Sequence, residues 1–402
     1  MTTAAPTRPT KDFAERRQDV RRFVDEELIP REPILDRNDD SSAEAMAELK
    51  RLAKERGVWA LGHPAAIGGG GLPFMDYVMI NEIVGRSYWG TEALGTLSFQ
   101  DCLMLLEFGT EAQRAKWVPL LFEGVTGPTI GMTEPEVAGS DPTLVQSTAV
   151  LDGDEWVING HKWFTSGANK AMYTSVFVKT DPDAPKHQQF SLILVPTDTP
   201  GYRIERVVRT MGHYGGNHCE VRYDNVRVPA ENLLGPRGGG FAVAQARLGP
   251  GRITHSMRWL GQAQRAFEIM CDRVQTRYAH GSVLAEKGEI QRYIAESAAQ
   301  IQAARLMTLD AARRIDAGQD ARVQISLIKF FGAQMLHDVI DRALQVHGAM
   351  GVTEDTPLER MYRDARYARI YDGPDEVHRM VVAKRLLRRD YRNEAPWSEI
   401  VR

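Results

Sequence analysis

Ile370-Tyr371-Asp372-Gly373-Pro374-Asp375-Glu376 is the stretch around which the rest of the sequence is organised. The pattern before it is helical and charged, and helical spacing returns after it. Gly373-Pro374 cannot continue a helix, because glycine is conformationally free and proline has no amide donor. The sequence therefore predicts a sharp corner between two helices, with the carboxylate of Asp372 on it. From the corner alone, a helix cap and a side chain aimed at a neighbouring cleft stay equally open.

Length and composition indicate a globular protein of two or three domains. The chain has 402 residues, of which 43% are hydrophobic and 26% are charged. A net charge of −3 does not indicate the strongly basic surface that binds nucleic acid. Residues 1–11 do not form a signal peptide, and the longest apolar run, at 190–195, is too short to span a membrane. The three cysteines lie far apart, which suits a reducing compartment, so we expect a cytoplasmic protein.

The order of helical and strand patterns predicts three domains in a fold that is mostly α with a central β domain. Residues 1–127 indicate an N-terminal helical domain, residues 128–236 a small β-barrel or sandwich, and residues 237–402 a C-terminal four-helix bundle. Asp152-Gly153 and Asn159-Gly160 predict hairpin turns between short strands.

The junction with the bundle and its first helix are marked by glycine and proline. Residues 238–240, three glycines, indicate a linker. Pro250 predicts either the start of the first bundle helix or a kink in it, with the helix over residues 247–277.

Two loops carry polar and aromatic residues suited to a planar, partly anionic ligand. In the first, at 132–141, the hydroxyls of Thr133 and Ser140 and small residues between them can bring backbone donors close to a ligand. In the second, at 159–167, Trp163 can pack against an aromatic ring of a ligand, and Thr165 can donate a hydrogen bond to a ring nitrogen. Each loop alone is structural by default, and the pair strengthens the case for a binding site.

The sequence lacks the motifs of several other enzyme classes. No GxGxxG follows a strand, and there is no HExxH, no cysteine pair with metal spacing and no GxSxG elbow. The glycine run at 68–71 lacks the Lys-Ser/Thr of a phosphate loop, so it predicts a flexible surface turn. We expect no metal site, because these histidines are isolated: His161, His213, His218, His337 and His347.

The corner and the two loops together resemble the acyl-CoA dehydrogenase family. The usual family forms are Ile-Tyr-Glu-Gly, Thr-Glu-Pro-x-Ala-Gly-Ser-Asp and Asn-Gly-x-Lys-x-Trp-Ile-Thr. All three match here in order, and the likeness covers nearly the whole chain after residue 12. The first loop has one extra residue, at Glu136-Val137, and the corner carries Asp372 where the family carries Glu.

The resemblance implies an enzyme that binds FAD and an acyl-CoA thioester. By position, Asp372 is the catalytic base. The cofactor contacts implied in the β domain are Ile130, Met132, Thr133, Ser140, Trp163, Phe164 and Thr165. The residues implied near the substrate are Ser140, Arg247, Tyr371 and Gly373.

The resemblance also implies a homo-oligomer, a tetramer in preference to a dimer, in which a second chain completes each site. Arg277 matches a residue that reaches a neighbour's FAD pyrophosphate, although Ala279-His280 follows where the family usually has Thr-Phe. In the family, a Gln-x-x-Gly loop contacts the adenosine half of a neighbouring subunit's FAD. The matching residues here are Gln345, Val346, Gly348 and Ala349. Near the FAD phosphates, Pro374 and Glu376 replace the usual Thr and Gln, and Pro374 removes at least one family hydrogen bond.

In the implied reaction, a base removes the proton α to the thioester while hydride leaves the β carbon. We therefore expect burial to raise the pKa of Asp372 toward neutrality, and its backbone N–H to stabilise the enolate-like oxygen. Aspartate is one methylene shorter than glutamate, and a displacement of about 1 Å can cost on the order of a hundredfold in rate.

Three explanations of the shorter side chain stay open. The backbone is shifted to suit it, the substrate is bulkier or placed differently, or the site is poor at this chemistry. A branch of the family shares the corner and the 247–252 stretch, which favours the first two. Some relatives carry the base on the first bundle helix, where this chain has Ala246, which cannot serve.

The leading hypothesis is an acyl-CoA dehydrogenase that forms a 2,3-enoyl-CoA and passes electrons to an electron-transferring flavoprotein. A flavin oxidase such as a nitroalkane oxidase, which also uses an Asp base, is the second. A non-catalytic relative that binds nucleic acid is disfavoured by the net charge. The arginines that recur at 360, 363, 366 and 369 predict a solvated or subunit-facing helix edge in preference to a site for CoA phosphates.

Overall fold

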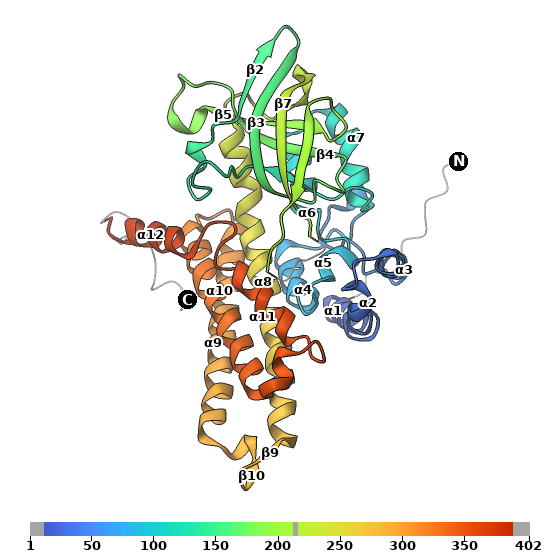
Figure 1. Cartoon of the computed structure of the whole chain (residues 1–402), viewed down its shortest axis with the longest axis vertical. Helices are drawn as coiled ribbons and strands as arrows, with labels where there is room; N and C mark the ends of the chain where they lie inside the picture. Colours follow the sequence, from blue (N-terminus) through green and yellow to red (C-terminus); the bar gives the residue numbers. More distant parts are fainter. Residues whose placement is uncertain (1–11, 212–215, 389–402) are drawn as a thin grey trace.

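A β-sheet domain and a bundle of long helices lie at opposite ends of the molecule, and the N-terminal helices pack beside the middle (Figure 1). The structure is a computed structural model that describes residues 12–211 and 216–388. It confirms the predicted class, mostly α with a central β domain. The expectation that residues 1–11 are no signal peptide, and the isolated His213, fall outside the described residues.

The helices from α1 to α5 (residues 13–93) share one apolar core, in which Phe23, Leu28 and Leu49 are fully buried, whereas α6 and α7 (residues 99–122) pack in a second core with the sheet. A π-helical segment (Phe23–Leu28) and a 3-10 turn (Ile29–Arg31) connect the first two helices. The bounds are α1 (Phe13–Arg22), α2 (Glu32–Leu35), α3 (Asp40–Glu55), α4 (Phe74–Val84), α5 (Gly90–Ala93), α6 (Phe99–Phe108) and α7 (Glu111–Phe122).

The glycine run at 68–71 forms the predicted turn, but the turn is tightly packed instead of flexible. Its four backbone N–H groups all donate to carbonyl oxygens within residues 60–65. A Cβ atom on Gly69 would lie 2.2 Å from the carbonyl oxygen of His63, so close backbone packing explains the glycines. No donor of this run is left over for a phosphate.

The central domain is one eight-stranded sheet in the order β6-β7-β3-β2-β4-β5-β8, with β1 paired in parallel to β4. It fills the place of the predicted barrel or sandwich, and the sequence did not indicate β6. The bounds are β1 (Ile130–Gly131), β2 (Thr148–Asp152), β3 (Glu155–Ser166), β4 (Tyr173–Lys179), β5 (Phe190–Pro196), β6 (Tyr202–Val207), β7 (His218–Pro229) and β8 (Leu233–Leu234).

One of the two predicted hairpin turns is present and the other is wrong. Asp152 pairs with Glu155 across the turn at Gly153, whose φ is 65°. Asn159-Gly160 instead lies inside β3, where the register with β7 shifts between Ile158 and Gly160. A Cβ atom on Gly160 would lie 2.1 Å from Ser147 Oγ, so the glycine allows close strand packing at a bulge and does not make a turn.

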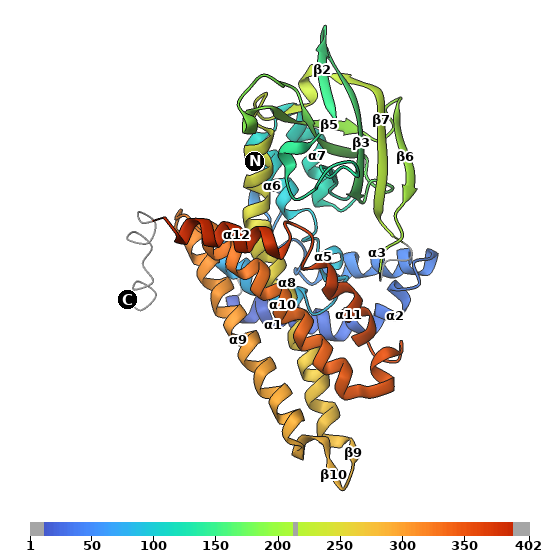
Figure 2. The same cartoon turned by 60° about the vertical axis from the view of Figure 1, so that its left-hand side comes forward.

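Three long helices and two shorter ones form the bundle. The bounds are α8 (Gly240–Thr276), α9 (Gly288–Asp316), α10 (Arg322–His347), α11 (Leu358–Tyr367) and α12 (Asp375–Leu386). The short hairpin of β9 (Tyr278–Ala279) and β10 (Ser282–Val283) closes the tip between α8 and α9. The corner divides the predicted fourth helix into α11 and α12, and α12 lies across the ends of α9 and α10 next to the sheet domain (Figure 2). In the described ranges, no helix has the length and apolar character that a membrane crossing requires.

The linker expected at residues 238–240 is shorter than predicted, because Gly240 already begins α8. A Cβ atom there would lie 2.6 Å from the backbone of Ser191, so the glycine lets the helix start against β5. Pro250 lies inside α8, which continues through it to Thr276.

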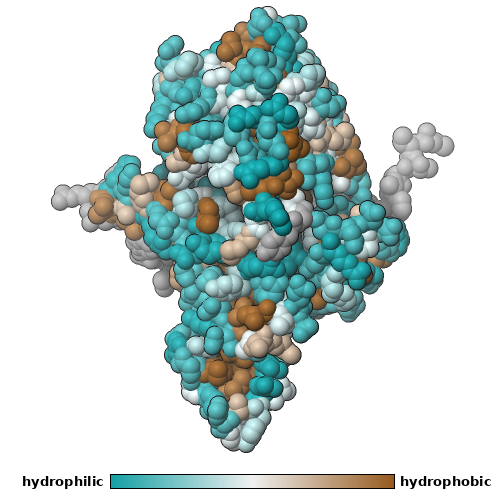
Figure 3. Space-filling view, viewed as in Figure 1, coloured by the Kyte–Doolittle hydropathy of each residue, from teal (hydrophilic) through white to brown (hydrophobic). Residues whose placement is uncertain are grey.

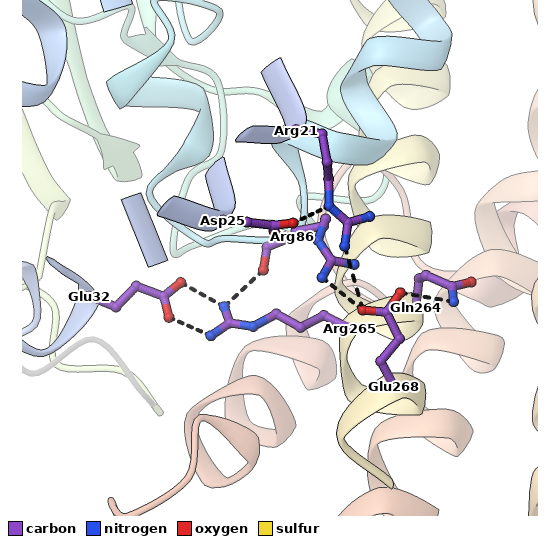
Figure 4. Close-up of polar contacts among 7 residues, drawn as sticks. All are labelled: Arg21, Asp25, Glu32, Arg86, Gln264, Arg265 and Glu268. Atoms are coloured by element: carbon purple, nitrogen blue, oxygen red, sulfur yellow. Dashed lines mark hydrogen bonds and ion pairs between the residues drawn. The ribbon is translucent and has the colours of Figure 1, made fainter. Parts of the chain in front are cut away.

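Arginine–carboxylate pairs join the N-terminal helices to α8 (Figure 4). Arg265 is 8% exposed and donates through both terminal nitrogens to Glu32, each at 2.8 Å, and also to the carbonyl oxygen of Arg86 at 3.0 Å. Arg86 in turn pairs with Asp25 at 3.2 Å and with Glu268 at 2.8 Å. These contacts fix the position of α8, which carries part of the site.

Candidate active site

The predicted corner is present and its backbone is held firmly. Asp372 has a φ of 54°, in the left-handed region that few non-glycine residues adopt, and Gly373 follows with a φ of 99°. Two side chains donate to the Asp372 carbonyl oxygen, Arg252 Nε at 3.0 Å and His378 Nε2 at 3.1 Å. Gly373 is required, because a Cβ atom there would lie 2.7 Å from His378 Nε2.

The carboxylate of Asp372 faces α8. His255 Nε2 lies 3.3 Å from Asp372 Oδ2, and the Asp372 side chain is 23% exposed. On the other side of the imidazole, Arg258 Nη2 lies 2.8 Å from His255 Nδ1. Among the described residues, His255 is the only side chain recorded within 4 Å of this carboxylate as a polar partner, so most of its lone pairs remain available.

The charges around the corner keep Asp372 ionised. Burial alone raises the pKa of the carboxyl, but the nearby positive groups outweigh it and hold the pKa below the ordinary value. Those groups are Arg252, Arg247 and Lys329. The chain's own residues therefore do not produce the expected rise toward neutrality.

Tyr371 and Lys329 anchor the corner from the bundle side. Trp259 Nε1 donates to Tyr371 Oη at 2.8 Å, and Lys329 Nζ donates to the Ala368 carbonyl oxygen at the end of α11 at 2.6 Å. Lys329 is fully buried and lies over both aromatic rings, at 5.5 and 5.7 Å from the ring centroids. Burial lowers the pKa of Lys329 to about 8.

The predicted substrate residue Arg247 is committed to an ion pair inside the chain. Its Nη2 lies 2.9 Å from Asp101 Oδ2, and its Nε lies 3.2 Å from both carboxylate oxygens. Arg247 still contributes to the positive field at Asp372.

Three of the four recurring arginines also pair within the chain, which corrects the prediction of a solvated edge for them. Arg366 is exposed. The pairs are Arg360 with Asp36, Arg363 with Glu359 and Arg369 with Asp375.

The first predicted loop lies against the second predicted segment, which is not a loop but the end of β3. Trp163 N donates to the Thr133 carbonyl oxygen at 3.0 Å. Trp163 Nε1 and Thr165 Oγ1 are buried polar atoms that have no partner within the described part of the chain. Buried donors of this kind normally have a partner, so the pair fits a polar, planar group such as the ring of a flavin.

A buried ion pair that the sequence analysis did not single out joins these two segments. Lys162 Nζ lies 2.8 Å from Glu134 Oε1 and also donates to the Met132 carbonyl oxygen at 3.1 Å. Glu134 accepts from the backbone N–H groups of Gln146 and Ser147 as well. Burial lowers the pKa of Lys162 to about 8. Burial raises the pKa of Glu134, but the charge of Lys162 and the hydrogen bonds from Lys162, Ser147 and Gln146 together outweigh it, so the pKa of Glu134 is lowered.

The remaining predicted residues fall into three places. Ile130, Ser140 and Phe164 belong to the β domain, where Ser140 and Phe164 are exposed. Pro374 caps α12 and the Glu376 side chain is 76% exposed beside it. The residues Arg277, Gln345, Val346, Gly348 and Ala349 lie at the ends of α8 and α10.

One chain cannot bring all of these residues together. α8 starts against the sheet and has 37 residues, so at about 1.5 Å per residue it spans roughly 54 Å before it reaches Arg277. Figure 1 shows β9 and β10 at the opposite end from the sheet. The bundle-tip residues therefore cannot contact the loops of their own β domain.

Comparisons with known proteins agree with this architecture. Models of the acyl-CoA dehydrogenase N-terminal, middle and C-terminal domains match residues 10–125, 129–226 and 238–387. The Mycobacterium tuberculosis protein named "Probable acyl-CoA dehydrogenase FadE2" is 46% identical over 88% of each chain. Mouse acyl-CoA dehydrogenase family member 10 is 40% identical over 93% of this chain, which spans only 37% of that longer protein.

Solved structures agree as well. Acyl-CoA dehydrogenase from Geobacillus kaustophilus is 28% identical, with a TM-score of 0.84 over 96% of this chain and all of that one. Butyryl-CoA dehydrogenase from Megasphaera elsdenii is 27% identical, with a TM-score of 0.83 over the same shares. The fold and site define an oxidoreductase of the flavoprotein class. The chain belongs to the acyl-CoA dehydrogenase family.

Proposed function

We propose that this chain binds FAD and converts an acyl-CoA thioester to the 2,3-enoyl-CoA, with Asp372 as the base. The observation that carries the proposal is the ionised, partly exposed carboxylate of Asp372 on a fixed corner. When bound, FAD supplies the acceptor for the hydride that leaves the β carbon. The proton on the α carbon goes to the carboxylate of Asp372.

The backbone of Asp372 suits the second requirement of this reaction, which is to stabilise negative charge on the thioester oxygen. Within the described ranges, the Asp372 N–H donates to no protein acceptor, while its carbonyl oxygen is held by Arg252 and His378. A fixed, unused donor beside the base can serve an oxyanion as the charge develops.

The residues that would hold FAD come from two chains. Thr165 and Trp163 carry the unpartnered buried donors in one chain, and Arg277, Gln345 and Gly348 would come from a neighbour's bundle. Exposed apolar side chains on the bundle, such as Tyr278 (65%) and Val352 (64%), suit an interface between copies. Figure 3 shows hydrophobic patches within the mostly hydrophilic lower half of the molecule, where the bundle lies. We propose a homotetramer.

The electrons are proposed to pass to an electron-transferring flavoprotein, on the ground of family membership. An oxidase on the same scaffold would instead consume oxygen without a protein acceptor. Anaerobic reduction by acyl-CoA, followed by comparison of reoxidation by air and by an artificial acceptor, separates the two.

The decisive variant is Asp372→Asn, which keeps the shape of the side chain but removes the proton acceptor. We expect FAD and acyl-CoA binding to persist, because the proposed oxyanion donor is a backbone N–H. Flavin bleaching by a good acyl-CoA in anaerobic stopped flow should fall by several orders of magnitude. Near-normal bleaching would show that Asp372 only stabilises the corner and that the base lies elsewhere.

A further inference from the structure

The contacts of His255 determine which of its nitrogens carries the proton. Arg258 lies 2.8 Å from Nδ1, and a guanidinium can only donate. Nδ1 must therefore accept, which places the proton of the neutral imidazole on Nε2. Nε2 is the atom that lies 3.3 Å from Asp372 Oδ2.

The surroundings keep this imidazole neutral. Burial and the adjacent Arg258 lower the pKa of His255 to about 3, against the smaller opposing effect of Asp372. Arg247 on the same helix and Lys329 on α10 also face the ring and act in the lowering direction. A neutral donor can orient a carboxylate without neutralising it, whereas an imidazolium would form a full ion pair and weaken the base.

We propose that His255 is a positioning residue for Asp372, and that Arg258 holds it in the tautomer that presents Nε2–H to the carboxylate. The proposal rests on the proposed role of Asp372 as base. His255 Nε2 lies 3.3 Å from one carboxylate oxygen, which leaves the other oxygen to accept the α proton. A short side chain whose backbone is fixed by Arg252 and His378 needs only this one further contact to define its direction.

The test measures the rate of anaerobic flavin bleaching from pH 5 to pH 9 in three variants. His255→Phe removes the donor, so we expect the rate to fall about tenfold or more and its acid limb to move to higher pH. His255→Gln offers an amide N–H in place of Nε2–H and should recover most of the rate. His337→Phe changes a bundle histidine that packs on Tyr362 outside the corner, and it should leave rate and profile unchanged.

Arg258→Gln provides a second, independent readout. Without the guanidinium charge, the pKa of His255 should rise, although burial, the larger cause of its low value, remains. The bleaching rate should then begin to fall at a higher pH than in the wild type, because protonated His255 pairs fully with Asp372. The Arg258→Lys variant keeps a cationic donor and should keep the wild-type profile. Acyl-CoA affinity, followed by the flavin spectrum, should stay near wild type in every variant.

The outcomes separate this inference from the proposed function. If Asp372→Asn is inactive while His255→Phe and Arg258→Gln keep the wild-type rate and profile, Asp372 is the base and the positioning role of His255 is wrong. If His255→Phe loses acyl-CoA affinity instead of rate, His255 is a binding residue and the inference also fails. An active Asp372→Asn variant overturns the proposed function itself.

Discussion

Asp372 combines a short side chain with an uncommon backbone conformation. Its left-handed φ and the two donors on its carbonyl oxygen leave the backbone little freedom. Such strain persists only where the surroundings fix it, and it gathers at functional sites. These contacts favour a backbone arranged to suit aspartate over a weakened version of a glutamate site.

Asp372→Glu tests this explanation at the residue itself. A backbone fitted to aspartate makes glutamate overreach by about 1 Å, so bleaching should slow on the order of a hundredfold while FAD content stays constant. The measurement is single-turnover bleaching with one acyl-CoA. The neighbouring Asp375→Glu variant would not serve as a control, because Asp375 is buried and paired with Arg369. A faster Glu variant would mean that Asp372 is a degraded glutamate.

At the scale of elements, the sequence predicted the corner well and its surroundings poorly. Gly373-Pro374 is a local signal, so the break between α11 and α12 follows from neighbouring residues. His255 and Arg258 lie on α8, more than a hundred positions earlier in the chain, and no spacing in the sequence connects them to Asp372. The turn predicted at Asn159-Gly160 was wrong for a related reason. Gly160 packs closely against Ser147, which is thirteen positions earlier in the sequence, and the pair forms a bulge instead of a turn.

The buried pair Lys162–Glu134 should hold the first predicted loop and the end of β3 together. Lys162→Met leaves the carboxylate of Glu134 buried without its cation, which costs about 3–5 kcal/mol in comparable pairs. We expect a lower unfolding midpoint and partial loss of FAD on gel filtration. Lys170→Met, an exposed lysine close by, should change the stability by less than about 0.5 kcal/mol. Retention of FAD and midpoint by Lys162→Met would exclude this role.

At the scale of the whole molecule, α8 connects the three parts of the fold. It starts against the sheet, carries the residues that face Asp372, and pairs with the N-terminal helices through Arg265 and Glu268 (Figure 4).

Arg265→Met should loosen the N-terminal helices from α8. The substitution leaves Glu32 without its bidentate partner in a largely buried setting, so we expect a loss of about 3–5 kcal/mol in urea unfolding followed by tryptophan fluorescence. Arg292→Met removes an exposed arginine from two helical ion pairs and should leave the urea midpoint close to that of the wild type. Equal losses for the two variants would contradict a special role for the buried pair.

A site shared between chains can be tested by mixing two defective ones. Asp372→Asn chains lack the base and Arg277→Gln chains lack the proposed contact with a neighbour's FAD. In a hybrid oligomer purified through two different tags, some sites combine the intact Asp372 of one chain with the intact Arg277 of the other. We expect these hybrids to recover activity that neither parent oligomer has. An inactive hybrid would show that Arg277 serves its own chain's site, and an active Arg277→Gln parent would show that it serves none.

The length of α8 also limits which changes in the gene the protein can tolerate. Inserting one residue between Glu268 and Arg277 advances the tip by about 1.5 Å and rotates it by roughly 100° about the helix axis. Contacts near Asp372 would stay intact, while the tip would turn away from the neighbouring subunit that it is proposed to serve. Natural variation in this interval should therefore consist of substitutions, and a one-codon deletion should affect the neighbouring subunit's cofactor before it affects its own chain's base.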